Sequence, residues 1–132
     1  MKTVTLNMIN EFKIYELGYD FMGFKLNKND KLTFHHLIVP KRDGGLYVRN
    51  NGAIIQRVPH DYLHIIERYD PKLFYYLTSE MIDMNIKGFL DSYNIANIHS
   101  ILDEFEYQHE GQTTRKGKLL IKREYKQGRA VL

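Results

Sequence analysis

The sequence predicts an α+β fold, and three observations favour it. Residues 32–39 and 53–58 are short apolar segments of the kind that form strands, and turn-forming residues separate them. The first helix after these strands is expected over about 59–69, because Pro59 suits the first turn of a helix. Beyond it, apolar residues recur at the three- and four-residue spacing of an amphipathic helix. We therefore expect a pair of strands followed by a helix-rich remainder.

Further elements are expected on both sides of this unit. Residues 21–26 predict a strand that a polar turn joins to 32–39, and Pro40 ends the second strand because it has no N–H group. Asp70 and Pro71 have the chemistry of a helix start, with Asp70 as the N-cap. The remaining expected elements are a helix over 6–17, a helix over about 95–109 and a short strand at 119–121.

Composition predicts one soluble globular domain. The chain has 132 residues, of which 43% are hydrophobic, so a substantial core can form. We expect one domain over residues 1–111, with the strand–strand–helix unit at about 32–69, and a basic C-terminal tail over 112–132. No apolar run is long enough to span a bilayer, and the N-terminus lacks the apolar stretch of a secretory signal. The absence of Cys excludes disulfides and Cys-based zinc sites, and cytoplasmic residence is expected.

Charge is distributed unevenly along the chain. The formal net charge is +3, but residues 112–132 contain seven basic residues and a single acid, Glu124. A basic segment on a slightly acidic body suggests a polyanion partner. A simply solvated chain end would show the same composition, and composition alone slightly favours it. The basic residues are Arg115, Lys116, Lys118, Lys122, Arg123, Lys126 and Arg129.

Four of the six histidines fall within residues 35–64, and their spacing suggests a metal site. His35 and His36 are neighbours in an expected strand, so their side chains point to opposite faces. His60 and His64 are four residues apart in an expected helix, where both lie on one face and can hold one metal ion. Taken alone, the helical pair is more simply a solvated surface pair. The combination with His35 favours ligands that converge from two elements.

The segment FHHLIVPKRDGGLYVRNNGAIIQRVPHDYLH resembles the motif of the HNH endonuclease family. The His35-His36 pair followed by Pro40, the Gly-Gly loop and the helix with His-x-x-x-His all match the family pattern. Asn51 lies nine residues before His60, which is the family interval. Gly52 stands where the family commonly has Leu, which leaves Asn50 as an alternative to Asn51. The resemblance covers about a quarter of the chain and implies a ββα-metal (His-Me finger) core with additional flanking helices and the basic tail.

This resemblance implies a reaction and a role for each residue. His35, His60 and His64 would bind one divalent metal ion, and His36 would act as the general base on water. Asn51 would fix the loop that orients this base, or would bind the metal as in some branches of the family. Three imidazoles favour zinc, nickel, cobalt or manganese over magnesium. Family members use zinc, magnesium or manganese, so the identity of the ion stays open.

The expected substrate is a nucleic acid, DNA more than RNA. Lys41, Arg42 and Arg49 lie in the loop beside the expected centre and could contact flanking phosphates, or they could simply be solvated. Glu67 is a surface residue or an acceptor for a ligand imidazole. His99 and His109 are given no catalytic role. The sequence does not predict an oligomeric state.

Two other functions compete with a metal-dependent endonuclease. The first is a catalytically silent HNH-like protein that binds nucleic acid or protein as a regulator or inhibitor. The second is a purely structural zinc module, in which His36 has no role. The resemblance also implies a setting in phages, mobile elements or bacterial defence systems.

Overall fold

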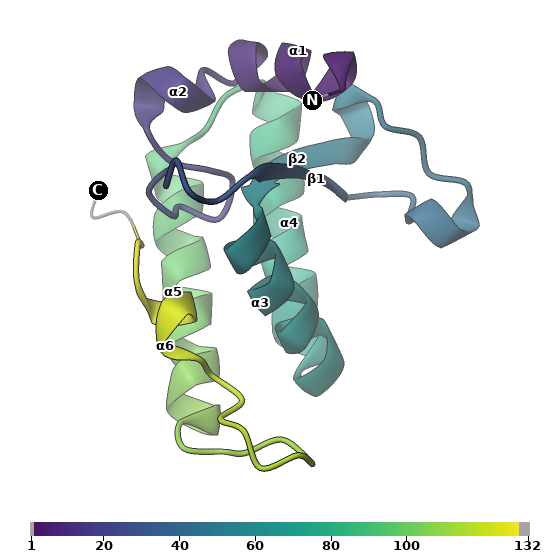
Figure 1. Cartoon of the computed structure of the whole chain (residues 1–132). Coiled ribbons are helices and arrows are strands. Elements are labelled where there is room, and N and C mark those ends of the chain that lie inside the picture. The colour runs from purple at the N-terminus through teal and green to yellow at the C-terminus, as the bar shows by residue number, and fades with distance from the viewer. Residues whose placement is uncertain (1, 130–132) are drawn as a thin grey trace.

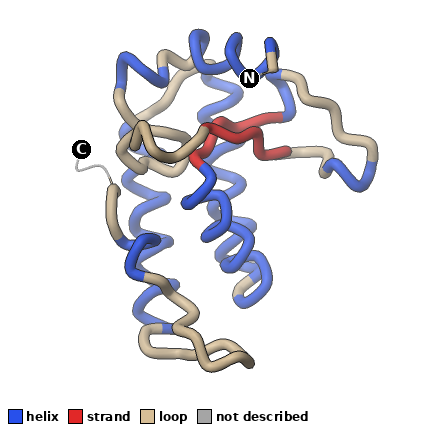
Figure 2. Tube along the Cα trace, viewed as in Figure 1, coloured by secondary structure: helices blue, strands red, loops and turns tan. Residues whose placement is uncertain are grey.

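A computed structural model describes residues 2–129, and it contains six α-helices, two short 3-10 helices and two strands in that part of the chain (Figure 1 and Figure 2). This mixture of helices with a small antiparallel sheet confirms the α+β class. The elements in chain order are α1 (Thr3–Glu11), α2 (Ile14–Leu17), β1 (Leu32–His36), η1 (Lys41–Asp43), η2 (Arg49–Asn51), β2 (Gly52–Gln56), α3 (Arg57–Tyr69), α4 (Pro71–Lys87), α5 (Ser92–His109) and α6 (Arg123–Lys126).

β1 and β2 form an antiparallel pair whose register runs from Leu32 opposite Gln56 to His36 opposite Gly52. Strand alternation therefore places Thr33 and His35 on one face of β1. Phe34 and His36 lie on the other face. β2 is buried along its whole length. The expected strand over 32–39 ends early, at His36. The chain leaves the sheet there and enters a loop that projects from the body of the molecule (Figure 1).

Helix α3 follows β2 directly and carries one buried face. It begins at Arg57, two residues earlier than expected, and the Asp30 carboxylate accepts a hydrogen bond of 3.0 Å from the Val58 N–H in its first turn. A cap supplied by a residue this distant in sequence is invisible to a local pattern. Tyr62, Leu63 and Ile66 of this helix are buried. The other face of α3 is free to carry polar side chains.

The start of α4 agrees with expectation. The Asp70 side chain accepts a hydrogen bond from the Leu73 N–H, and Pro71 occupies the first turn. Gly88 ends the helix with a φ of 79°, a left-handed conformation that favours glycine. In Figure 1, α1 and α2 lie above the strands, α3 runs down from them, and α4 passes behind them, in contact with both α3 and α5. The main core fills the space between these elements.

The expected helix over 6–17 is two helices, α1 and α2. Lys13 between them has a φ of 55°, which breaks the helical path. Phe12, just before the break, is 1% exposed and packs edge-on against Phe21 with ring centroids 4.8 Å apart. Buried residues occur on both sides of the bend, so the apolar spacing alone does not reveal it.

The expected strand over 21–26 is wrong, because this segment folds around a buried carboxylate. Asp20 Oδ1 accepts hydrogen bonds from the Met22 and Phe24 N–H groups at 2.9 and 3.1 Å. Its Oδ2 accepts from the backbone and the side chain of Gln56 in β2. Burial raises the pKa of Asp20 to about 6, although these hydrogen bonds lower it. The result is a turn with isolated bridges, Tyr19 to Lys25 among them.

The basic C-terminal segment packs on the domain as far as residue 129. Leu120, Ile121 and Tyr125 are buried, and the Tyr125 ring stacks on Tyr62 of α3 with centroids 4.6 Å apart. The expected strand at 119–121 is wrong, because only an isolated bridge forms there, between Thr113 and Leu119. Residues 130–132 of the expected tail lie outside the described residues. Within residues 2–129, no helix is both long and apolar enough to cross a membrane.

Candidate metal centre

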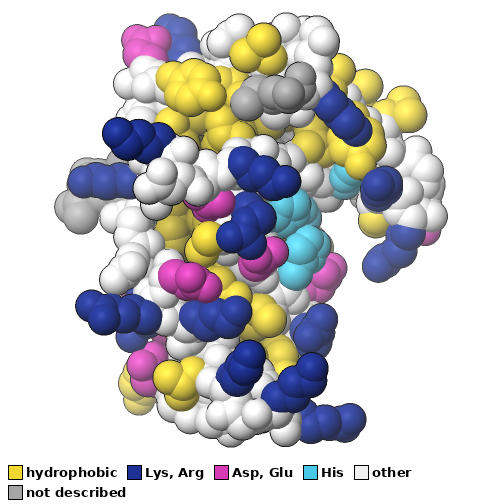
Figure 3. Space-filling view, viewed as in Figure 1, with side chains coloured by type: hydrophobic (Ala, Val, Ile, Leu, Met, Phe, Trp, Pro, Cys, Tyr) yellow, Lys and Arg dark blue, Asp and Glu magenta, His cyan; other side chains and the backbone are white. Residues whose placement is uncertain are grey.

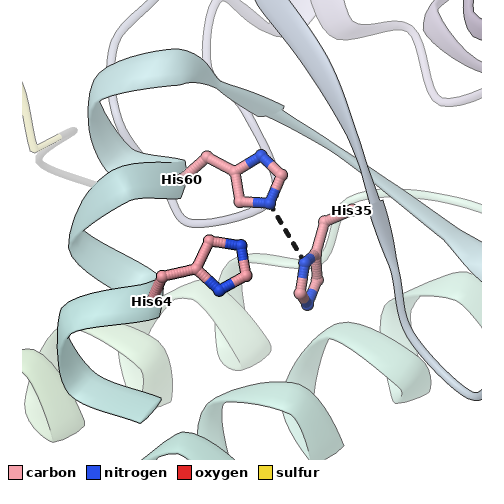
Figure 4. A group of neighbouring side chains, drawn as sticks. All are labelled: His35, His60 and His64. Carbon is pink, nitrogen blue, oxygen red and sulfur yellow. Dashed lines mark hydrogen bonds between the residues drawn. The ribbon is translucent and has the colours of Figure 1, made fainter. Parts of the chain in front are cut away.

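Three imidazoles meet at the junction of β1 and α3, as the sequence predicts. His35 comes from β1, and His60 and His64 project from successive turns of α3 toward it (Figure 4). One ring nitrogen of each lies within 4.8 Å of the others. His35 Nδ1 and His60 Nε2 are 3.2 Å apart, and the rings of His60 and His64 stack with centroids 4.8 Å apart. This group is called the histidine triad below.

The spacing within the histidine triad fits one bound metal ion. Two imidazole nitrogens on a tetrahedral zinc ion, at about 2.0–2.1 Å from it, lie about 3.3 Å apart. The distance of 3.2 Å between His35 and His60 is close to that value. The His64 side chain is 52% exposed, so it can rotate toward the other two without disturbing the core. The residues present therefore fit a divalent ion with three imidazole ligands and open positions on the solvent side.

Two further side chains orient the helical histidines. The Thr33 hydroxyl lies 2.5 Å from the Ile55 carbonyl oxygen and 2.7 Å from His60 Nδ1. Because the hydroxyl donates its one proton to the carbonyl, it accepts from His60 Nδ1–H. Glu67 Oε1 lies 3.2 Å from His64 Nδ1, so that nitrogen is the donor on His64. Both histidines then keep the Nε2 lone pair for a metal, an arrangement common among metal-binding histidines.

Burial keeps the two inner imidazoles neutral. Loss of solvation lowers the pKa of His35 to about 3 and that of His60 to about 4, and the charge of neighbouring histidines adds to the effect. His35 is 7% exposed, and its Nε2 atom is buried without a hydrogen-bond partner among the described residues. A metal binds imidazole in its neutral form. These two side chains therefore need not lose a proton to bind a metal at neutral pH.

The Asn51 side chain fixes the loop between the two strands through four hydrogen bonds. Its Oδ1 accepts hydrogen bonds from the Ile38 and Val39 N–H groups at 2.9 and 2.7 Å. Its Nδ2 donates to the carbonyl oxygens of Val39 and Leu46 at 2.9 and 3.2 Å. These four bonds tie the two ends of the loop together, and none of them involves a residue of the histidine triad. The geometry matches the expected loop-fixing role of Asn51, whereas Asn50 is exposed.

A glycine permits this loop to close tightly. Gly45 donates from its N–H to the Pro40 carbonyl oxygen at 2.9 Å. A Cβ atom at residue 45 would lie 2.0 Å from the Val39 carbonyl oxygen, so a side chain is excluded there. The Gly-Gly sequence is therefore a geometric requirement of the loop.

His36 lies on the opposite face of β1 from the histidine triad. Its ring contacts Phe34 at 4.8 Å and Tyr47 at 4.6 Å between centroids, both edge-on. The residue is only partly buried, although its Nε2 has no hydrogen-bond partner within residues 2–129. Desolvation and then the charge of Lys41 lower the pKa of His36, and a hydrogen bond to the Gly45 backbone acts in the opposite direction. His36 is thus neutral at pH 7 and sits beside the triad in sequence without joining it.

The three loop cations differ in what they contact. Arg49 forms an ion pair with Glu11, lies over the Phe12 ring at 5.0 Å and reaches the Asn85 carbonyl oxygen at 3.4 Å. The protein itself therefore holds the guanidinium group that was expected to contact phosphate. Lys41 and Arg42 are exposed on the loop.

The histidines occupy the wall of a hollow in the surface. Figure 3 shows histidine side chains between the projecting loop and the helical body, with Lys and Arg side chains on the loop and around the lower end of the hollow. Acidic side chains also border the histidines in this view. The hollow therefore presents imidazoles at its wall and cations at its two ends.

Sequence reasoning missed two side chains of this region. Thr33 stands two residues before His35, so strand periodicity places it on the same face, and that signal was available. Tyr47, which contacts His36, gives no local signal because a long loop separates the two. The histidines given no role lie elsewhere, with His99 bonded to the Gly23 carbonyl and His109 to Gln112.

Comparisons with protein-family models, with curated proteins and with solved structures return no match to this chain. The interpretation of the site therefore depends on its own geometry.

Proposed function

We propose that this protein is a metal-dependent endonuclease of the HNH type, which hydrolyses phosphodiesters of nucleic acid, DNA more than RNA. The observation that carries the proposal is the histidine triad, in which His35, His60 and His64 bring one nitrogen each within 4.8 Å. The triad stands at the junction of two strands and a helix, the arrangement that a ββα-metal core requires. The loop between β1 and β2, which the Asn51 side chain fixes, supports the same interpretation.

The chemistry of the triad suits phosphodiester hydrolysis. The phosphate anion repels a nucleophile, and the leaving alkoxide is poor. A bound divalent ion would polarise the phosphate, neutralise developing charge and stabilise the leaving oxygen. The three imidazoles would hold such an ion with one nitrogen each and would leave its remaining positions for the phosphate and water. His60 and His64 are oriented for this by Thr33 and Glu67.

His36 is the proposed general base. It is neutral at pH 7 because desolvation lowers its pKa, so it can accept a proton from the attacking water. Phe34 and Tyr47 hold its ring edge-on. His36 is the last residue of β1, and in the proposed mechanism the phosphate would lie across this end of the strand, between His36 and the histidine triad. Asn51 would keep His36 in place by holding the loop that follows it.

Exposed cations supply the affinity for a polyanion. Lys41 and Arg42 lie on the projecting loop, and the C-terminal segment contributes further exposed basic residues. Figure 3 shows basic side chains at both ends of the hollow that contains the histidines. Contacts of this kind to phosphates are independent of sequence and weaken as salt rises.

One observation favours a second candidate, a metal-binding module without nuclease activity. His36 faces away from the histidine triad, toward Tyr47, and a regulator or inhibitor that binds nucleic acid or protein needs no general base. The same experiment separates the two functions.

The experiment compares purified wild-type protein with His36→Ala and with the control His109→Ala, in which a half-buried histidine at the end of α5, outside the triad, is removed. Circular and linear DNA, single-stranded and duplex, is incubated with each protein and Mg²⁺, Mn²⁺, Ni²⁺, Co²⁺ or Zn²⁺. Cleavage by wild type and the control, with loss of about two orders of magnitude or more in His36→Ala, supports the nuclease. Metal binding by all three proteins, without cleavage of these DNA substrates or of RNA added in a parallel set, supports the silent module instead.

A further inference from the structure

A groove runs along β1, and none of the three histidines of the triad lines it. It encloses a volume of about 1000 Å³ between the N-terminal helices, the 26–31 segment and β1. Phe34 and Tyr47 line it, and both also contact the His36 ring. The groove therefore ends beside the proposed general base. The phosphodiester hydrolysis proposed for the histidine triad does not involve this groove.

The groove presents aromatic side chains to solvent. Tyr15 of α2 lines it, and 62% of this residue is exposed. Phe34 and Tyr47 are half-buried and form the wall next to His36. Exposed aromatic rings in a groove are the surfaces on which unpaired nucleobases stack. In a duplex the bases already stack on one another and are not available for this.

The groove is also basic. Lys2, Lys28 and Lys31 line it and are exposed, and Lys2 Nζ lies 3.7 Å from the centroid of the Tyr47 ring. Asp30 is the one acid in the lining, and its carboxylate accepts a hydrogen bond from the Val58 N–H. Basic side chains alternating with aromatic ones give a surface that follows a phosphate backbone and stacks its bases.

We propose that this groove holds an unpaired stretch of nucleic acid, so that the substrate of the endonuclease proposed above, on which this inference rests, is a single strand. Among residues 2–129, β1 pairs only with β2, so its other edge is open. A strand that leaves the groove at the end of β1 passes His36 and crosses this edge toward the histidine triad. Stacking in the groove then positions the phosphate that is cut.

The test is fluorescence anisotropy with a short labelled DNA strand of mixed sequence and with the corresponding duplex. Binding is measured in EDTA and low salt, so that cleavage does not contribute. The groove variants are Tyr15→Ala and the double variant Lys28→Glu with Lys31→Glu. A charge-matched control replaces Lys116 and Lys118 by Glu in the C-terminal segment.

The wild type is expected to bind the single strand more tightly than the duplex. Tyr15→Ala should weaken single-strand binding about fivefold or more and leave duplex binding nearly unchanged. The double groove variant should also reduce the preference for the single strand, whereas the control should weaken both forms alike. Tighter duplex binding by the wild type, or equal losses for both DNA forms in the groove variants, would overturn the proposal.

Zinc binding and thermal unfolding of each variant show that the fold and the triad are intact. Failure of the nuclease proposal is recognised separately. In that case no metal supports cleavage by the wild type, while the single-strand preference and its loss in Tyr15→Ala are still measured in EDTA.

Discussion

The Thr33 hydroxyl lies 2.7 Å from His60 Nδ1 and thereby connects the strand pair to the metal-ligand candidate on α3. The same hydroxyl donates to the Ile55 carbonyl oxygen across the sheet, which leaves it only an acceptor for the imidazole. His60 therefore carries its proton on Nδ1, and its Nε2 atom, which faces His35, keeps a free lone pair.

Replacement of Thr33 by Val should weaken metal binding while the fold is retained. Val keeps the branched shape but removes the acceptor for His60 Nδ1–H, and loss of such a partner commonly costs about 10- to 100-fold in metal affinity. Competition with a chromophoric chelator measures this. Thr78→Val is the matched control, because the Thr78 hydroxyl is buried without a hydrogen-bond partner in the described part of the chain. Equal affinities in the two variants would contradict the role given to Thr33.

Replacement of Asn51 by Ala should loosen the loop between the strands. Four part-buried hydrogen bonds are lost, so the free energy of unfolding should fall by about 2 kcal/mol or more. Urea unfolding measures the loss, and limited proteolysis should cut within 37–48 earlier. Asn50→Ala changes an exposed neighbour and should behave as wild type. The reverse pattern would assign the loop-fixing role to Asn50.

The free energy of unfolding of the metal-free protein should fall as pH falls, because the buried histidines are harder to protonate in the folded state than in the unfolded state. The folded-state pKa of His35 is lowered from 6.5 to about 3, so its contribution is fully present above pH 6.5 and is lost as pH falls toward 3. Asp20, with its pKa raised to about 6, acts in the opposite direction in wild type and variant alike. Between pH 6 and 4, the free energy of unfolding should fall less steeply with pH in His35→Asn than in the wild type. The difference between the two slopes should be about 1.4 kcal/mol per pH unit.

Urea unfolding in EDTA at several pH values measures these slopes. Identical slopes for wild type and His35→Asn would show that His35 is not held neutral by burial.

The C-terminal segment should contribute to stability as part of the core. Leu120 is 2% exposed, whereas its neighbour Leu119 is 57% exposed, so the two form a matched pair. Leu120→Ala should lower the free energy of unfolding by about 2–5 kcal/mol and Leu119→Ala by much less. Thermal or urea unfolding distinguishes them. Similar small losses for both would mean that the segment does not pack in solution as the structure has it.

The parts of the fold that could be predicted are those set by local chemistry. Asp70 and Pro71 start α4 because capping depends on neighbouring residues alone. The triad was predictable in the same way, since helical spacing places His60 and His64 on one face. His35 faces them because strand alternation places it on the same face of β1 as Thr33, whose hydroxyl contacts His60.

The parts that could not be predicted depend on distant contacts. The turn at 20–24 exists because Asp20 binds Gln56 in β2, which no local pattern reveals. The C-terminal segment is basic and polar on average, yet Tyr125 finds a stacking partner in Tyr62. Tyr47 reaches His36 only because the intervening loop folds back. In each case one side chain makes a contact with a residue distant in sequence, and the composition of its own segment does not indicate that contact.

The central claim is that His35, His60 and His64 form one metal site, and calorimetric titration of the metal-free protein with Zn²⁺ at pH 7 tests it most directly. The account predicts one ion per chain for wild type and for the control His109→Ala. It predicts strongly weakened binding in each of His35→Ala, His60→Ala and His64→Ala. Undiminished binding in the three triad variants, or no binding by the wild type, would contradict it.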